Sequence, residues 1–292
     1  MAKNDAPLSV RDLCKNYPAF MLDHVSFDLV PGAITGFIGR NGAGKTTTLN
    51  SILSFIKPDG GEVRFSGLSM ADHAAEIKQK IGFVSAGMAY YTGKKLKTIT
   101  EVTRSFYPGW DDAAYQKYMG RFGLDESKTP ASLSNGMKIK YALALALSHG
   151  AELMLLDEPT SGLDPVSREE LIEIFLALRD DGKTILFSTH ITSDLDKCAD
   201  RILFLQKGRL TADSALDNFI GAYRLAAYAG SVPENAASCV LGTCRTREGC
   251  TALFKREDAE RMAIDCRQPD LEEIMVHLEK EETVTAQPAA SQ

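Results

Sequence analysis

Residues 39–47 carry the clearest chemistry in the sequence. They read Gly39-Arg-Asn-Gly-Ala-Gly-Lys-Thr-Thr47, with an apolar run before them and a helix-forming stretch after them. Glycines at this spacing let successive backbone N–H groups converge on phosphate oxygens at a helix N-terminus. Lys45 is then expected to reach the β- and γ-phosphates, and the Thr46 hydroxyl to bind Mg²⁺. The predicted nucleotide-binding residues of this loop are Gly39, Asn41, Gly42, Gly44, Lys45, Thr46 and Thr47.

Two acidic residues form the second half of the predicted site. Asp157 and Glu158 directly follow the apolar run at 153–156. In open α/β sheets, ligands bind outside the carboxyl ends of the strands. We therefore expect Asp157 to bind Mg²⁺ and Glu158 to accept a proton from an attacking water. The alternative is that both acids cap the turn that follows them.

His190 ends a third apolar run, at residues 184–187, which continues as Ser188-Thr-His190. Its place at a strand end predicts that a neutral imidazole hydrogen-bonds the γ-phosphate and orients the water. A single histidine is more often structural, and that is the expectation for the four others, His24, His73, His149 and His277.

The elements that must position these side chains indicate an α/β fold. Short continuous apolar runs at 81–84, 153–156 and 184–187 are typical of parallel strands buried on both faces. Residues 8–31, 63–65 and 201–206 lie between turn signals and favour an antiparallel β layer. Residues 86–150 are mostly helical in pattern, which predicts an inserted helical lobe.

The chemistry ends near residue 210, which predicts a domain over residues 1–210. Residues 211–282 mix strand-like pieces with a final amphipathic helix at 269–281, so a small C-terminal α+β domain is expected there. Residues 283–292 are of low complexity and are predicted to be a disordered tail. Cys239, Cys244, Cys250 and Cys266 match no common zinc spacing and are expected to be free thiols.

Composition narrows the function classes. Of 292 residues, 44% are hydrophobic and 25% charged, which is typical of a globular protein. A formal net charge of -6 argues against a general nucleic-acid binder. The first residues lack a signal-peptide pattern, and no apolar stretch approaches the roughly 18–20 residues that span a bilayer. Any role at a membrane is therefore expected to come through a partner.

Several motifs occur in an order that resembles the nucleotide-binding subunits of ATP-binding cassette (ABC) transporters. Leu133-Ser-Asn-Gly-Met137 resembles the family's signature motif, usually Leu-Ser-Gly-Gly-Gln, and Ser161-Gly-Leu-Asp164 resembles its D-loop. His190 resembles the switch histidine, and Tyr17 the aromatic residue that stacks on adenine. The resemblance covers residues 8–210 and implies a P-loop NTPase of the ABC cassette fold.

This resemblance implies an ATPase that uses ATP and Mg²⁺. In the family two cassettes sandwich two ATP molecules head to tail, so Ser134 and Gly136 are expected to meet a γ-phosphate held by the opposite subunit. Asp164 of the D-loop is also expected to be a nucleotide-binding residue. The implied function is the ATP-hydrolysing subunit of an exporter, cytoplasmic and peripheral on the inner face of the membrane. It would drive a separately encoded permease as a homodimer or heterodimer, with no nucleic acid involved.

Two alternative functions are compatible with parts of the sequence. A soluble ABC ATPase acting on ribosomes or nucleic acid is the main alternative, although this chain has one cassette and no long heptad run. A P-loop kinase or GTPase is disfavoured because the sequence lacks a guanine-recognition motif and would leave residues 133–137 unexplained.

The chain also departs from the family pattern. Asn135 and Met137 replace the usual Gly and Gln of the signature, as in a subset of bacterial exporters. Ala86 falls where the family has a Gln or Glu that contacts Mg²⁺ and reports on the membrane partner, which predicts slowed hydrolysis or altered coupling. Aromatic and lysine residues at 90–110 either receive the cytoplasmic helices of a permease or form core and solvated surface.

Overall fold

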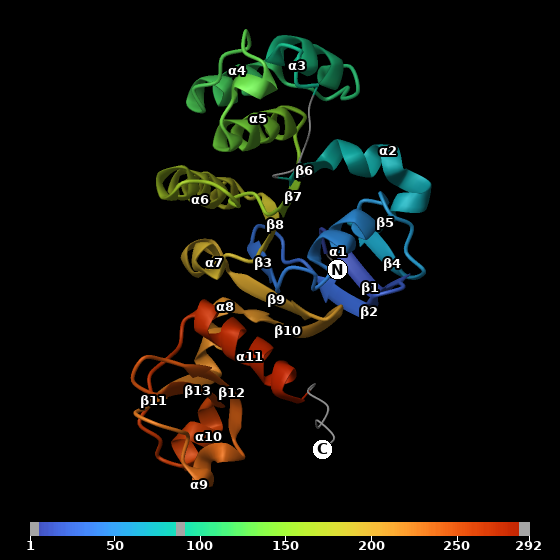
Figure 1. Ribbon diagram of the computed structural model, residues 1–292. Helices are drawn as coiled ribbons and strands as arrows, with labels where there is room; N and C mark the ends of the chain where they lie inside the picture. Colours follow the sequence, from blue (N-terminus) through green and yellow to red (C-terminus); the bar gives the residue numbers. More distant parts are fainter. Residues whose placement is uncertain (1–5, 86–90, 286–292) are drawn as a thin grey trace. The chain divides into compact units, whose positions relative to one another are not determined.

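The computed structural model describes residues 6–85 and 91–285. These described residues fold into two compact units, one within residues 1–190 and 197–213 and the other within residues 191–196 and 214–292. The first unit contains a six-stranded sheet, a four-stranded sheet and a group of helices, and the second contains a three-stranded sheet with its own helices (Figure 1).

The six-stranded sheet is the frame of the first unit. Its strands lie in the order β10-β9-β3-β8-β7-β6, and neighbours from β9 to β6 run parallel. Strands β3, β7 and β8 are buried along their whole length, which explains their continuous apolar sequences and confirms the predicted parallel core. The bounds are β3 (Ile34–Ile38), β6 (Ile81–Ser85), β7 (Leu153–Asp157), β8 (Thr184–Thr189), β9 (Arg201–Gln206) and β10 (Arg209–Ala215).

The antiparallel layer is a four-stranded sheet in the order β2-β1-β4-β5. It contains β1 (Ser9–Tyr17), β2 (Phe20–Asp28), β4 (Gly60–Phe65) and β5 (Leu68–Ser69). The assignment of residues 201–206 to this layer was wrong, because they form β9, which pairs in parallel with β3. All but the first residue of β9 is buried, so the glycine turn after it marked a core strand and not an edge of the outer layer.

A shared apolar core joins the two sheets of the first unit. Leu22 and Phe27 of β2 belong to the same buried cluster as Phe37 of β3 and Leu155 of β7. Helix α1 (Lys45–Ile52) also buries Leu49 and Ile52 in this cluster. The remaining helices of this part are α2 (Met70–Lys80) and α6 (Pro165–Asp180), while α7 (Thr192–Cys198) lies across the boundary of the two units.

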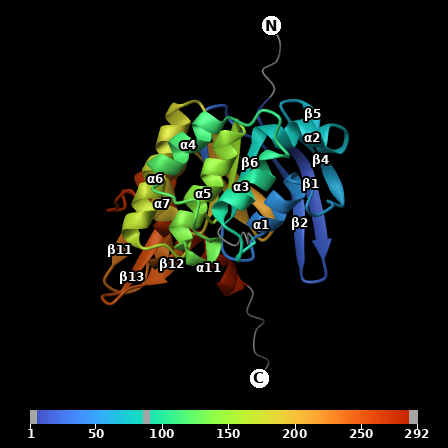
Figure 2. The same ribbon diagram turned by 90° about the horizontal axis from the view of Figure 1, so that it is seen from above.

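The helical lobe follows β6 in the sequence, and its centre is polar. Its helices are α3 (Leu96–Arg104), α4 (Asp112–Arg121) and α5 (Asn135–Ser148), and they lie side by side in Figures 1 and 2. Asp111 caps α4 by accepting hydrogen bonds from the N–H groups of Ala113 and Ala114. At the centre, Thr100 Oγ1 lies 2.9 Å from the Tyr115 hydroxyl and 2.8 Å from the Tyr141 hydroxyl, which ties all three helices together.

The second unit is an α+β unit built on an antiparallel sheet in the order β11-β13-β12. Helix α11 packs on β12 and β13 and buries Leu271, Ile274 and His277. It continues through Thr285, three residues into the predicted disordered tail, and the rest of that tail lies outside the described residues. The elements are α8 (Leu216–Gly221), β11 (Tyr223–Tyr228), α9 (Glu234–Ala237), β12 (Val240–Arg245), β13 (Cys250–Lys255), α10 (Arg256–Arg261) and α11 (Leu271–Thr285).

Candidate functional site

The phosphate loop turns sharply between β3 and α1, and two glycines allow it. A Cβ on Gly39 would lie 2.3 Å from the carbonyl oxygen of Leu205, so the backbone approaches β9 too closely for any side chain. Gly44 precedes α1 with φ of 112°, and a Cβ there would lie 2.6 Å from the ring of Phe20. The loop therefore ends at a helix whose first N–H groups have no partners within the helix and are available to an anion.

Lys45 is held inside this loop. Its side chain is only 6% exposed, and Nζ donates a hydrogen bond to the carbonyl oxygen of Gly39 at 2.7 Å. Nζ also lies 3.3 Å from Oε1 of Glu158. The loop thus keeps one ammonium group extended over its own backbone, beside the strand that supplies the acids.

Thr46 and Asp157 bring oxygen atoms together from α1 and β7. Thr46 Oγ1 donates to Oδ2 of Asp157 at 3.1 Å, and Ser188 Oγ donates to Oδ1 at 2.8 Å. Burial raises the pKa of the Asp157 carboxyl above its usual range, against the opposing effect of these two hydrogen bonds. Hard divalent cations prefer oxygen ligands, and a buried carboxylate beside a hydroxyl supplies them.

Glu158 and His190 lie next to each other at the ends of β7 and β8. Oε2 of Glu158 lies 2.8 Å from Nδ1 of His190 and accepts from the His190 backbone N–H at 3.3 Å. Glu158 adopts the left-handed backbone conformation, with φ of 52°, and its N–H donates to the Ser188 carbonyl. A non-glycine residue in this conformation is strained, and such strain is concentrated at functional sites.

A pocket of about 350 Å³ lies over the loop. Its lining includes Phe20 of β2, which the sequence did not suggest as a site residue, whereas Tyr17 is not part of the lining. Tyr17 lies on the same hairpin and is 41% exposed, and Nζ of Lys15 lies 5.7 Å from the centroid of its ring. The lining residues are Phe20, Arg40, Asn41, Gly42, Gly44, Lys45, Thr46, Thr47 and Glu158.

The signature and D-loop residues form a second structural group, built by the starts of α5 and α6. Ser134 caps α5 by accepting from the N–H of Met137 at 3.2 Å. Asp164 caps α6 by accepting from the N–H groups of Val166 and Ser167. A Cβ on Gly136 would lie 3.6 Å from the Ser167 Cβ, so the two helix starts touch.

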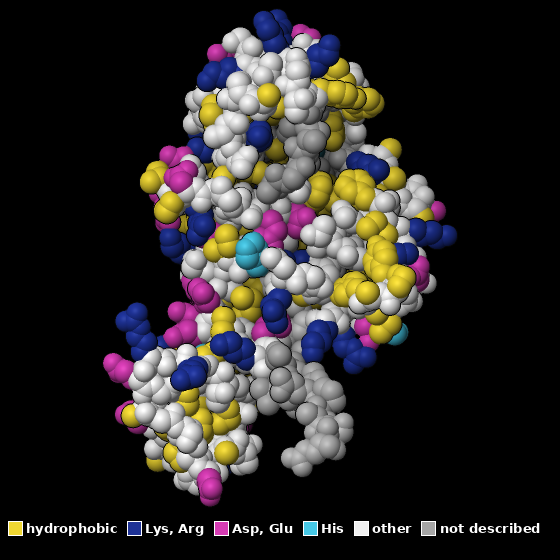
Figure 3. Space-filling model, in the orientation of Figure 1, with side chains coloured by type: hydrophobic (Ala, Val, Ile, Leu, Met, Phe, Trp, Pro, Cys, Tyr) yellow, Lys and Arg dark blue, Asp and Glu magenta, His cyan; other side chains and the backbone are white. Residues whose placement is uncertain are grey.

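The aromatic residues of the lobe divide between core and surface. Tyr107 stacks on buried His149 with ring centroids 3.9 Å apart, and Trp110 packs against Tyr115. Phe106 is 70% exposed, and Figure 3 shows hydrophobic side chains gathered on the lobe and on the antiparallel sheet of the first unit. Ala86 and Tyr90 lie outside the described residues, so the expectation for Ala86 stays a prediction.

The arrangement suits one kind of chemistry. Loop N–H groups and an ammonium are ready for phosphates, oxygen ligands for a divalent cation, and a carboxylate paired with an imidazole for activating water. Within residues 6–85 and 91–285 no group of three or more His, Cys, Asp or Glu side chains could hold a metal ion, and all six cysteines are free.

Comparison with known proteins agrees with this geometry. A family model described as ABC transporter matches residues 22–161. The ABC transporter ATP-binding protein YtrB of Bacillus subtilis is 32% identical over 68% of this chain and 68% of its own length. The bacitracin transport ATP-binding protein BcrA of Bacillus licheniformis is 31% identical over 72% of this chain and 70% of its own length.

One solved structure is similar in both sequence and fold. It is described as the ATP-binding subunit of an ABC transporter, with a TM-score of 0.66 and 30% sequence identity, and the match covers 73% of this chain and 91% of that one. The family model, at residues 22–161, includes the phosphate loop and the two acids.

Proposed function

The chain belongs to the ABC transporter family as an ATP-hydrolysing, ATP-binding subunit, and from that premise we propose how its residues handle Mg·ATP and which partners complete the site. The observation that carries the proposal is the contact chain from Lys45 through Glu158 to His190 at the carboxyl edge of the sheet. This chain of contacts joins the ammonium group that would bind phosphate to a carboxylate that is paired with an imidazole.

Lys45 and the loop bind the phosphates. Residues at the start of α1 line the pocket, where their N–H groups are available to phosphate oxygens. Nζ of Lys45 donates a hydrogen bond to the Gly39 carbonyl at the same loop. Phe20, whose ring packs over Gly44 and lines the same pocket, supplies an apolar surface beside the loop. Tyr17, on the same hairpin, is the candidate for stacking on adenine.

Thr46 and Asp157 are the residues that would hold Mg²⁺. Their oxygens already lie 3.1 Å apart, and the buried Asp157 carboxylate gains from a neighbouring positive charge because burial disfavours its ionised form. When bound, Mg²⁺ neutralises charge that develops on the phosphate oxygens. The Ser188 hydroxyl orients Asp157 by donating to its other carboxylate oxygen.

Glu158 is the general base in this proposal. Its carboxylate is 21% exposed and is oriented through Oε2 by both the ring and the backbone N–H of His190. Oε1 faces Lys45, the group that would hold the γ-phosphate, so a water between that oxygen and the phosphate would be placed for attack. His190 positions the base and is the residue that we expect to hydrogen-bond the γ-phosphate.

A second nucleotide-binding subunit completes the site. Ser134 uses its side chain on one N–H of α5, which leaves other N–H groups of the first turn of this 14-residue helix available to an anion. Gly136 keeps the backbone bare at that end. We expect these groups to bind the γ-phosphate of the ATP held by the opposite subunit. That subunit would be an identical or a related chain.

A membrane permease is the expected partner at the helical lobe. A groove of about 300 Å³ lies between the end of α1 and the lobe, with Phe55, Phe83 and Tyr107 among its apolar walls. Phe55 is 60% exposed there, which suits an apolar segment of a partner. The relatives compared above are transport proteins by name, and export is the direction that we propose.

The subunit is proposed to work at the inner face of the cell membrane, where that permease would hold it. In the described part of the chain, no helix combines the length and the apolar character that crossing a bilayer requires. The relatives compared above are named for transport, and no observation favours action on ribosomes or nucleic acid.

Phosphate release from Mg·ATP by the purified chain tests the activity. Lys45→Ala should abolish release and ATP binding, because the loop loses its only buried ammonium among the residues lining the pocket. Lys57→Ala, which changes an exposed lysine, is the matched control and should hydrolyse ATP at the wild-type rate. Equal rates for Lys45→Ala and wild type would contradict the assignment.

A further inference from the structure

The groove between the end of α1 and the helical lobe, proposed above as the contact for a permease, has aromatic walls. Its volume is about 300 Å³. Phe55 and Phe83 pack edge to face within it, with ring centroids 5.8 Å apart, and Phe55 is 60% exposed. Walls of this kind accommodate the body of an aromatic side chain.

One nearly buried polar side chain, His149, also lines this groove. It is only 8% exposed, and its ring stacks on that of Tyr107 with centroids 3.9 Å apart. Nδ1 lies 3.0 Å from the carbonyl oxygen of Gln79. Because a carbonyl oxygen only accepts hydrogen bonds, Nδ1 must carry the hydrogen and act as the donor. The stack and this hydrogen bond fix the imidazole in the wall of the groove.

The second ring nitrogen of His149, Nε2, is therefore a hydrogen-bond acceptor. Burial lowers the pKa of the imidazole below its usual value, so the ring is neutral at neutral pH and carries one N–H. Within residues 6–85 and 91–285, no group donates a hydrogen bond to Nε2. A nearly buried acceptor without a donor is unfavourable, and an occupant of the groove can supply that donor.

The charge around the groove selects among possible donors. Lys78 lines the groove, and no acidic residue is among its described lining residues. Besides burial, the positive charge of Lys183 contributes to the lowered pKa of His149. An ammonium or guanidinium group is disfavoured beside these two lysines. A neutral N–H or O–H on an apolar body is the donor that the lining favours.

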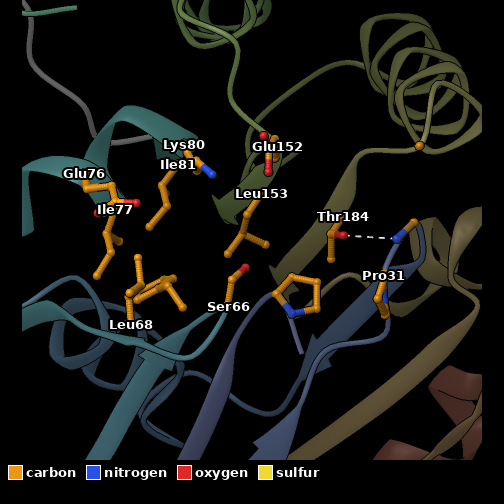
Figure 4. A pocket seen from close by; sticks show the side chains of 14 residues that line it. Pro31, Ser66, Leu68, Glu76, Ile77, Lys80, Ile81, Glu152, Leu153 and Thr184 are labelled. Atoms are coloured by element: carbon orange, nitrogen blue, oxygen red, sulfur yellow. Dashed lines mark hydrogen bonds between the residues drawn. The ribbon is translucent and has the colours of Figure 1, made fainter. Parts of the chain in front are cut away.

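A second cavity in the first unit lacks this feature in its described lining. Its volume is about 320 Å³, and it lies at the amino ends of β6, β7 and β8 (Figure 4). Its charged residues, Glu76, Lys80 and Glu152, are exposed. The buried Thr184 Oγ1 already accepts a hydrogen bond from the Gly32 N–H at 3.0 Å. The lining of the groove beside the lobe therefore says more about its occupant.

We propose that the permease segment in this groove is anchored by an aromatic side chain that carries a hydrogen-bond donor, tryptophan or tyrosine. The aromatic ring would lie against Phe55 and Phe83, and its N–H or O–H would donate to Nε2 of His149. Such side chains join an apolar body to one polar group, and they are enriched at protein interfaces. The inference rests on the permease contact proposed above and adds the chemistry of its anchor.

Binding of N-acetyltryptophan amide to the full chain tests this anchor. Chemical-shift titration should give a Kd on the order of 1 mM for a ligand of this size. The benzothienylalanine analogue has nearly the same shape, with sulfur in place of the N–H. It should bind at least about fivefold more weakly, the value of one hydrogen bond. Absence of N-acetyltryptophan amide binding up to about 10 mM, or equal affinity of the two compounds, would overturn the inference.

A variant and the imidazole itself locate the binding. His149→Phe keeps an aromatic ring beside Tyr107 but removes the acceptor, so it should bind the two compounds equally. His73→Phe changes an exposed histidine of α2 and should retain the preference for N-acetyltryptophan amide.

Nitrogen NMR spectra of the wild type should show Nε2 of His149 without a hydrogen, a result that does not depend on how any variant folds. A hydrogen on Nε2, or a preference retained in His149→Phe, would contradict the assignment. These measurements need neither a permease nor ATP, so their failure would overturn the anchor and leave the ATPase assignment standing.

Discussion

Oε2 of Glu158 lies 2.8 Å from Nδ1 of His190, although 31 residues separate them in the chain. The contact exists because β7 and β8 are adjacent and parallel, so the residues that follow them meet at one edge. The other carboxylate oxygen faces Lys45 at 3.3 Å. Glu158 is thus oriented by one neighbour and lies beside the positive charge of another, which aims its carboxylate at the phosphate side of the site.

If Glu158 and His190 act as a unit, their substitutions should not add. His190→Ala alone is expected to lower kcat by about 10²-fold or more, with ATP affinity little changed. In the Glu158→Gln background, His190→Ala should lower kcat very little further, because the carboxylate that His190 orients is already lost. Single-turnover rates of the wild type, the two single variants and the double variant give the coupling free energy between the two side chains. Additive losses would show that His190 acts on the phosphate alone.

Asp157→Asn should separate stability from metal binding. Because burial raises the pKa of Asp157, the folded chain holds the proton more tightly than the unfolded chain, and stability is lost as pH rises through the raised pKa. At neutral pH the neutral amide should therefore raise Tm of the nucleotide-free chain by about 2–4 °C. The same variant should need at least about tenfold more Mg²⁺ for half-maximal hydrolysis. Thermal unfolding and Mg²⁺ titration are the measurements, and a lowered Tm would contradict the argument.

The candidate site could be predicted largely because its residues follow short apolar runs in the sequence. Lys45, Asp157, Glu158 and His190 follow buried strands whose sequences are nearly all apolar, so pattern and motif coincide. Phe20 could not be found this way. Its contact with Gly44 depends on how the β1–β2 hairpin packs on the loop, and no local pattern encodes that distance.

The same limit explains the error in the fold. Residues 201–206 have the composition of a strand in either sheet, and only their pairing with β3 decides between them. Residues 191–196 belong to the second unit although they follow His190 directly. These residues include the start of α7, and the charge pattern of that helix carries no information on which unit its first residues join.

Tyr141→Phe should destabilise the helical lobe. Tyr141 is fully buried, and its hydroxyl bonds to Thr100 Oγ1 at 2.8 Å and to the Leu96 carbonyl at 3.0 Å. Removing it leaves buried partners unsatisfied, at a cost of about 1–3 kcal/mol. Tyr118→Phe is the control, since within the described part of the chain that hydroxyl has no hydrogen bond. Urea unfolding of both variants checks the prediction, and equal midpoints would refute it.

His277 should make the second unit sensitive to acid. Nδ1 lies 2.6 Å from the Glu273 carbonyl oxygen and Nε2 lies 3.0 Å from Thr251 Oγ1, while burial lowers the pKa of the imidazole. The unfolded chain then takes up a proton near pH 6.5 before the folded chain does, so stability is lost as pH falls from about 6.5 through the lowered pKa. Hydrogen exchange in α11 between about pH 7 and 5 should accelerate in wild type beyond the intrinsic change. The His277→Gln variant should lose that dependence, and an unchanged dependence would assign it elsewhere.

The central claim is that Glu158 activates water in a site that a second subunit completes, and Glu158→Gln tests it most directly. The measurement is phosphate release from Mg·ATP by the purified variant, read together with its molecular mass by light scattering. We expect phosphate release to fall by about 10²–10⁴-fold while ATP converts the variant from monomer to dimer. Adding Ser134→Arg to the variant should abolish that dimer and leave ATP binding intact. Hydrolysis by Glu158→Gln at the wild-type rate, or no dimer with ATP, would contradict the account.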